Sequence, residues 1–164
     1  MHIKDIMVSG DSVKRVKAGQ TVSEASLVMK QNKVSALPVV NEEEVVVGIV
    51  SARDLENKCR TECAVHGYDY DPYEWMTLSP TGTDPQSMGT LSGVFTSVGR
   101  TKVDDIMTTT VITARPDEQI TAAIRRMAES EINHLPVVGD DGRLVGIVAR
   151  NDVIKALASQ AEAG

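Results

Sequence analysis

A hydroxyl and a carboxylate stand three residues apart, directly after an apolar run that ends at Val50. These are Ser51 and Asp54. If a strand ends and a helix begins here, the unpaired N–H groups of the first helical turn favour an anion. The Ser51 hydroxyl can donate to a phosphate oxygen, and the two Asp54 oxygens can accept from the paired hydroxyls of a ribose. The pattern fits a nucleoside phosphate.

The same spacing also fits a purely structural role. Ser51 and Asp54 form the S-x-x-D pattern of a capping box, in which both side chains satisfy N–H groups of their own helix. The two interpretations are equally compatible with this motif. An acid recurs as Asp152, where Ala149 replaces the hydroxyl. Completing a capping box is therefore not the whole role of the acid, and ligand binding is favoured.

Three neighbours of the motif are further candidates for the binding site. Gly48 would let a ligand approach the backbone closely. Arg53 and Arg150 lie just inside the two predicted second helices, and either side chain could neutralise a phosphate or simply be solvated.

A weaker pattern suggests a metal. Cys59, Cys63 and His66 share one helical face if the helix extends that far, and a nearby aspartate could complete four ligands. The spacing matches no strong zinc motif, so we expect no metal. Two free thiols are the plain interpretation in a reducing cytosol.

The chain contains an internal duplication. Short runs recur 98 positions further along, and an Asp-Ile-Met triplet recurs 100 positions along. So many matches in nearly one register indicate two copies of one unit. The paired runs are residues 37–40 with 135–138, 47–50 with 145–148, and 5–7 with 105–107.

The sequence pattern of each copy predicts the order strand, helix, strand, strand, helix. Apolar residues from Ile120 to Ala128 follow helical spacing. Two apolar runs flanking a turn then predict a hairpin, and its second run (45–50 or 144–148) is apolar enough for burial on both faces. One copy is too small to bury its sheet alone. We therefore expect an α/β fold with two units packed sheet to sheet around a pseudo-two-fold axis, with clefts where the chain enters each second helix.

The copies occupy residues 1–58 and 102–164, and an insert of residues 59–101 separates them. The insert carries all five aromatic residues. A structureless linker of this length is unusual in a compact domain, and aromatic side chains need burial. The insert is expected either to fold over its own module or to form a lid or an interface. Its aromatic residues are Tyr68, Tyr70, Tyr73, Trp75 and Phe95.

Composition narrows the class of protein. The formal net charge is -6 and no basic block occurs, which argues against nucleic-acid binding. No apolar run approaches the roughly 20 residues of a membrane span, and the first residues lack the pattern of a signal peptide. We expect a soluble, cytoplasmic protein with no membrane insertion.

On these motifs the chain resembles a tandem pair of cystathionine-β-synthase (CBS) domains, often called a Bateman module. The resemblance rests on Asp-Ile-Met at each start, on Leu-Pro-Val-Val, and on Gly-Ile-Val-Ser-x-x-Asp. It implies the βαββα pair predicted above. It also implies binding of an adenosine nucleotide such as AMP, ADP or ATP between the repeats, and assembly into a homodimer.

Carried over by position, the resemblance implies a role for each candidate. Asp54 and Asp152 would hold ribose, and Ser51 would meet phosphate. The segments 13–16 and 111–114, which end in Val16 and Ala114, would line the base pocket. The position before Leu-Pro is often basic in the family and faces phosphate; here it is His134 in one copy and Ala36 in the other. The two sites are therefore not expected to be equivalent.

The function predicted from the sequence is a ligand-sensing regulatory module that needs no cofactor and is not an enzyme. The three histidines lie in unrelated segments without an evident nucleophile. With no effector domain on the chain, the output should act on an unknown regulated protein. The alternative is a structural interaction module that binds no ligand and uses the 68–95 part of the insert to dock a partner.

Overall fold

The computed structural model describes residues 1–65 and 85–163, with side chains from residue 93 onward in the helix that opens the second range. The first repeat has the predicted order. Its elements are β2 (Val16–Lys17), α1 (Val22–Asn32), β3 (Ala36–Val40), β4 (Val46–Ser51) and α2 (Ala52–Val65).

The second repeat matches this order except at its first strand, which is reduced to one parallel bridge between Ala114 and Val137. Outside the repeating units lie β1 (Val8–Ser9), α4 (Pro85–Arg100) and three 3-10 turns. The turns are η1 (Ile3–Asp5), η2 (Gly10–Ser12) and η3 (Val103–Asp105). The elements of the second repeat are α5 (Ile120–Glu129), β5 (His134–Val138), β6 (Leu144–Ala149) and α6 (Arg150–Ala163).

Local sequence explains the helices that begin each unit. Thr21 and Glu24 form a capping box at the start of α1, and Lys33 ends that helix in the left-handed conformation, with φ of 53°. In α5 the buried residues Ile120, Ala123 and Met127 follow the predicted stripe. Amphipathic spacing therefore placed both helices on their sheets.

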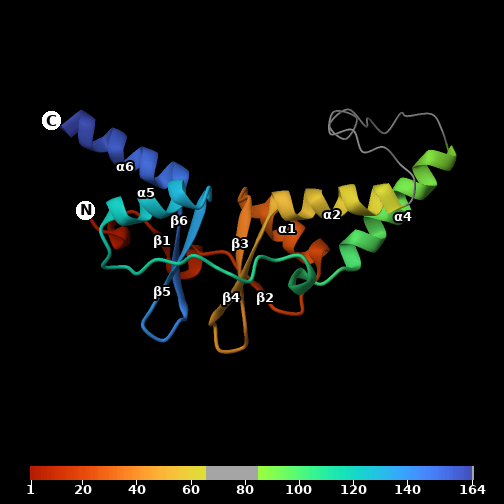
Figure 1. Cartoon of the computed structure of the whole chain (residues 1–164), viewed down its shortest axis with the longest axis horizontal. Coiled ribbons are helices and arrows are strands. Elements are labelled where there is room, and N and C mark those ends of the chain that lie inside the picture. The colour runs from red at the N-terminus through yellow and green to blue at the C-terminus, as the bar shows by residue number, and fades with distance from the viewer. Residues whose placement is uncertain (66–84, 164) are drawn as a thin grey trace.

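The two hairpins have the same register. Leu37 pairs with Val50 in β3 and β4, and Leu135 pairs with Val148 in β5 and β6. The sheets have the orders β2-β3-β4 and β1-β6-β5. Figure 1 shows the two hairpins side by side, each with its helices at one end. This equivalence confirms the duplicated α/β fold.

Between the hairpins lies a small shared core. Val13, Val40 and Leu144 are buried together, and Val45 bridges Arg143 across the two units. The backbone N–H of Leu144 donates to the carbonyl of Glu44 over 3.0 Å. The predicted sheet-to-sheet packing is therefore observed.

The leading segments, residues 1–13 and 101–113, are exchanged between the repeats. Strand β1 pairs with β6 of the second unit, and Ile3 is buried in the core of that unit. Conversely, Val103 is buried in the core of the first unit. In Figure 1 the segment that follows α4 crosses from one half of the molecule to the other. Each unit is thus completed by a segment of the other, which the boundaries 1–58 and 102–164 did not anticipate.

The insert is partly helical and partly folded over its own module. Helix α2 continues to Val65, so the predicted boundary at residue 58 falls inside a helix. Helix α4 packs against α1 and α2. Four of the five aromatic residues lie outside the described ranges; the fifth, Phe95, sits on α4 with 41% of its side chain exposed.

Candidate functional site

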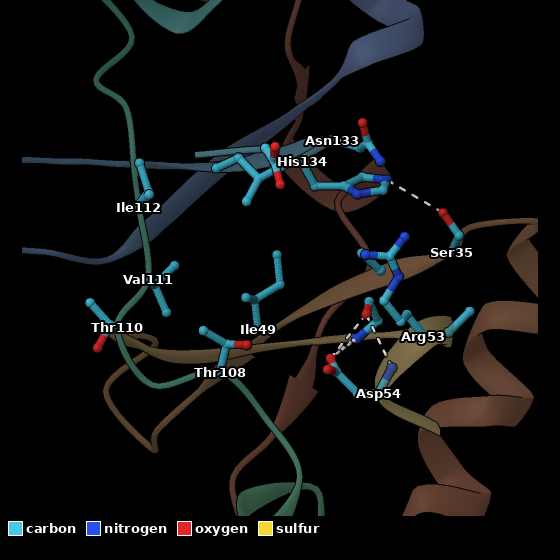
Figure 2. A pocket seen from close by; sticks show the side chains of 15 residues that line it. Ser35, Ile49, Arg53, Asp54, Thr108, Thr110, Val111, Ile112, Asn133 and His134 are labelled. Carbon is cyan, nitrogen blue, oxygen red and sulfur yellow. Dashed lines mark hydrogen bonds between the residues drawn. The ribbon is translucent and has the colours of Figure 1, made fainter. Parts of the chain in front are cut away.

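A cavity of about 420 Å³ lies between the repeats, where the chain enters α2. This volume falls within the range of about 300–1,000 Å³ that is typical of small-molecule pockets. The first repeat contributes Ser51, Arg53 and Asp54, and the second contributes His134. Figure 2 shows the 108–112 segment on one side of the cavity and Arg53 with Asp54 on the other. The predicted position of the cleft is correct.

Ser51 and Asp54 form a capping box, which is one of the two roles that the sequence allowed for this pair. The backbone N–H and the hydroxyl of Ser51 donate to Asp54 Oδ2 over 2.7 and 3.0 Å, and the Asp54 N–H reaches Ser51 Oγ at 3.4 Å. Asp54 Oδ1 makes no hydrogen bond within the described chain. One carboxylate oxygen therefore holds the helix end while the other remains free to accept.

The first turn of α2 keeps few free donors. The Ala52 N–H donates to the carbonyl of Ser35 over 2.8 Å, so it is not available to an anion. With the Asp54 N–H also used, the N–H of Arg53 is the first-turn donor that lacks a partner among the described residues. The expected set of unpaired N–H groups is smaller than the sequence suggested.

The apolar wall of the cavity comes from three residues, Ile49, Val111 and Ile112. Thr108 and Ile49 exchange two backbone hydrogen bonds of 2.9 and 3.0 Å, which fixes the second repeat's leading segment against β4. Because one face of β4 lines the cavity, Ile49 is only half-buried, and the expected burial of this strand on both faces is wrong. The strand buried throughout is β3.

Two predicted pocket residues lie elsewhere. Val16 pairs with Val39 and is buried in the core of the first unit. Ala114 bridges Val137 and is buried in the core of the second. Both residues occupy the strand position beneath the pocket. In the second copy the pocket is lined by Val111 and Ile112, which precede Ala114 by two to three residues.

His134 stands at the start of β5, facing Ser35 of the other repeat. Its Nε2 lies 3.5 Å from the Ser35 hydroxyl (Figure 2). Burial lowers the pKa of His134 below its usual value of 6.5, and the carboxylate of Asp152 offsets this only in part. The imidazole is therefore mostly neutral near pH 7 and serves as a hydrogen-bonding group.

Among the charged groups that line the cavity, one guanidinium faces two carboxylates, those of Asp54 and Glu131. Arg53 is exposed and contributes the guanidinium, while Glu131 contributes an acid from the second repeat. A ligand with one or two negative charges can be matched by Arg53 and the first-turn N–H. Glu131 opposes a longer row of phosphates.

Gly48 has a different use from the one predicted. A Cβ at this position would collide with the side chain of Met107 from the other repeat. Gly146 receives Met7 in the same way, with the carbonyl of Val8 also 2.9 Å from the Cβ position. Both glycines make room for the exchanged leading segments rather than for a ligand.

The other motif lies outside this cavity. Asp152 Oδ2 accepts from the Ala149 N–H over 2.8 Å, which repeats the cap without a hydroxyl. Arg150 follows it and donates its N–H to the carbonyl of Asn133 over 2.9 Å. Neither Asp152 nor Arg150 lines the cavity, although the Asp152 carboxylate is close enough to His134 to act on its pKa.

Cys59 and Cys63 do lie on one face of α2, as their spacing predicts. Both thiols are buried with Val22, Val94 and Val98 under α4. Burial raises the pKa of the Cys59 thiol, with smaller effects from Cys63 and Glu56. His66 lies outside the described residues, within which no group of three or more metal-ligating side chains occurs.

Sequence reasoning missed several polar lining residues. Ser35 and Asn133 occupy equivalent positions just before β3 and β5, 98 residues apart. Thr108 and Thr110 lie in the leading segment of the second repeat. The duplication could have drawn attention to the first pair. No sequence pattern points to the two threonines, because they reach the cavity only through the exchange of the leading segments.

This fold, with its cavity shared by the two repeats, defines a duplicated α/β module. The family model described as CBS domain matches residues 3–59 and 103–159. The chain belongs to the CBS domain family.

Known proteins are similar over most of the chain. An uncharacterized protein of Methanocaldococcus jannaschii is 36% identical over 133 residues, covering 78% of this chain and 76% of that protein. The CBS domain-containing protein YhcV of Bacillus subtilis is 30% identical over 162 residues, covering 99% and 89%. Other relatives are longer: the chain spans 23% of a homoserine O-acetyltransferase from Methanococcoides burtonii.

Among solved structures, the CBS-pair protein CBSX2 of Arabidopsis thaliana superposes with a TM-score of 0.72 at 26% identity, covering 99% of this chain and 97% of that one. A second structure of CBSX2, in complex with AMP, has a TM-score of 0.70 and covers 96% and 97%. In the described part of the chain, no helix is both long and apolar enough to cross a bilayer.

Proposed function

We propose that this chain is a regulatory module that binds an adenosine nucleotide in the cavity between its repeats and signals to a partner protein. The observation that carries the proposal is the origin of the cavity lining. Ser51 and Asp54 come from one repeat, whereas His134 comes from the other. A ligand held there contacts both units at once.

The lining supports a division of roles. Asp54 Oδ1 is the free acceptor for a ribose hydroxyl, and Val111 and Ile112 offer an apolar surface to a base. The Arg53 side chain and N–H are the donors for phosphate, and the Ser51 hydroxyl joins them when it exchanges its hydrogen bond to Asp54 Oδ2 for one to the ligand. With one guanidinium and two carboxylates in its lining, the cavity favours a nucleoside monophosphate over a triphosphate.

The relatives support the same ligand class. CBSX2, at 26% identity over nearly the whole chain, has been crystallised in complex with AMP. The regulatory role follows from linkage: a ligand that binds two orientations of the repeats with different affinity shifts the equilibrium between them. A partner protein that contacts both repeats can then distinguish the two states.

Binding rather than catalysis suits the groups in the cavity. Ser35 and His134 are the nearest approach to a nucleophile with its base in the described lining, at 3.5 Å. The described residues supply no hydrogen bond that would orient the other imidazole nitrogen, as such a pair requires.

Titration calorimetry with AMP, ADP, ATP, S-adenosylmethionine and NADH tests the proposal. We expect AMP to bind the wild type and Asp54→Ala to weaken binding at least about tenfold, which is the loss of one good polar contact. Glu24→Ala is the matched control, since it removes the capping-box acid at the start of α1, which does not line the cavity. Absence of heat with every ligand, or equal weakening by both variants, would contradict the assignment and favour the ligand-free interaction module.

A further inference from the structure

Helix α4 docks on a surface that both repeats build. Val94 and Val98 on α4 are buried against Val22 of α1 and the two cysteines of α2. Two partly buried residues complete this surface: Leu55 on α2 and Ile106 in the leading segment of the second repeat. The fit of α4 therefore depends on how the first repeat is placed against that segment.

The residues that complete the docking surface also adjoin the cavity. Leu55 directly follows Asp54 on α2, and Ile106 precedes Thr108 by two positions in the leading segment. Asp54 and Thr108 line the cavity from opposite sides (Figure 2). Leu55 and Ile106 pack in addition against the core of the first unit. A shift of Thr108 relative to Asp54 therefore changes the surface beneath α4.

The backbone gives a second connection between α4 and the cavity. Thr108 follows Arg100, the last residue of α4, by only eight positions. Within this stretch the Val22 N–H donates to the carbonyl of Thr101 over 2.8 Å, which joins the end of α4 to the start of α1. The cavity wall is thus a short continuation of α4, and α4 is held beside the first repeat at the point where that wall begins.

The composition of α4 makes its helix depend on docking. Its 16 residues include three glycines, and glycine is a poor helix former. With this composition, a helix of such length is marginal in water unless it packs on another element. A Cβ on Gly99 would collide with the Ser23 side chain, so this glycine lets α4 approach α1 closely. Docking and helix formation are coupled, and a change in the docking surface shifts the equilibrium between docked and undocked states.

We propose that α4 is the element through which the cavity signals: a nucleotide bound between the repeats stabilises the docked state of α4. This inference rests on the proposed function and names the output of that same site. A ligand that contacts Asp54 and the 108–112 segment holds both walls in the arrangement on which α4 docks. By linkage, docking of α4 raises the affinity for the ligand by the same factor.

Hydrogen exchange of the full chain, measured by mass spectrometry with and without saturating AMP, tests the proposal. Among the described residues that line the cavity, none belongs to α4 or to α5, so α5 serves as an internal control. We expect AMP to slow exchange in residues 93–100 about fivefold or more beyond any slowing in α5, as is typical of coupling between two sites. A ligand that only stabilises the folded chain as a whole would protect both helices equally.

The reciprocal effect gives an independent measurement. Val98→Asp places a charge in the buried docking surface and should undock α4, so calorimetry should show an AMP affinity reduced by the factor found in the exchange experiment. Ser97→Asp is the matched control, because it adds the same charge at the neighbouring exposed position of α4 and should leave the affinity unchanged. Circular dichroism verifies that both variants are folded. In the milder Val98→Ala, exchange of α4 should be faster than in the wild type and AMP should still slow it.

The outcomes separate this inference from the proposed function. Equal protection of α4 and α5 by AMP, or an AMP affinity of Val98→Asp equal to that of the wild type, would overturn the role of α4 and leave nucleotide binding in place. Failure of the wild type to bind AMP would overturn both proposals together.

Discussion

The thioether of Met107, in the second repeat, occupies the space that a Cβ on Gly48 of the first repeat would need. Met7 and Gly146 repeat this relationship in the opposite direction. Each leading segment thus crosses to the other unit and packs a flexible methionine over a strand glycine. The two contacts join the repeats on either side of the pseudo-two-fold axis.

Substituting the two glycines by alanine should have unequal effects. In Gly48→Ala the clash involves only the Met107 side chain, which can move, and we expect a loss of about 1 kcal/mol in the free energy of unfolding. In Gly146→Ala the new methyl group also meets the Val8 carbonyl, which is fixed in the sheet, so the loss should be about 2–3 kcal/mol. Urea denaturation measures both values.

The control is the double variant that combines Gly48→Ala with Met107→Ala. Its loss in the free energy of unfolding should be smaller than the sum of the losses in the two single variants. Equal destabilisation by the two glycine substitutions would refute the proposed difference between side-chain and backbone contacts.

The two helix caps should also differ in strength. Asp54 accepts from both the N–H and the hydroxyl of Ser51, while Asp152 accepts from one N–H. Replacing a capping residue by alanine costs about 0.5–2 kcal/mol. We expect Asp54→Ala to lie toward the upper end of this range and Asp152→Ala toward the lower end, as measured by chemical denaturation without ligand. A larger loss for Asp152→Ala would contradict this order.

Acid should weaken the fold through His134. Burial lowers its pKa in the folded state below 6.5, so the unfolded chain takes up a proton more readily. The stabilising contribution is present above pH 6.5 and is lost as the pH falls through 6.5 toward the folded pKa. Between pH 7.5 and 5.5, His134→Gln should therefore lose less free energy of unfolding than the wild type. If the two proteins lose the same amount, the imidazole is not the group responsible.

The thiols report on the docking of α4. Cys59 and Cys63 lie beneath Val98, and the raised pKa of Cys59 further slows its reaction with a disulfide reagent. Val98→Ala removes two methyl groups from this contact, which costs roughly 2 kcal/mol. We expect labelling at pH 8 to become about tenfold faster or more.

Gly93→Ala is the control for this measurement. A Cβ at residue 93 meets nothing within 4 Å, and alanine favours the helix, so labelling should slow. Identical rates in the wild type and both variants would mean that the thiols are reached by a route independent of α4.

Much of the site could be predicted from local sequence, because its positions are set by local rules. Ser51 and Asp54 mark the junction of a buried strand with a helix, and both interpretations of the pair proved compatible, since one oxygen of Asp54 caps while the other is free. His134 was assigned only through the family resemblance, in which the position before Leu-Pro is often basic. Val16, Ala114 and Gly48 were assigned to the ligand but serve the cores and the exchanged segments.

The sequence by itself determined the duplication, the order of the elements and the helix starts, because periodicity and capping residues record interactions within a few positions of each other. Only the tertiary structure decided that Ile3 packs in the core of the second unit and Val103 in the core of the first. It also decided that His134 shares a cavity with Asp54 and that α4 covers the two cysteines of α2. These relationships depend on which apolar surfaces bury each other across the whole chain. Two repeats with the same motifs leave that choice open, since each leading segment matches either unit by its local pattern.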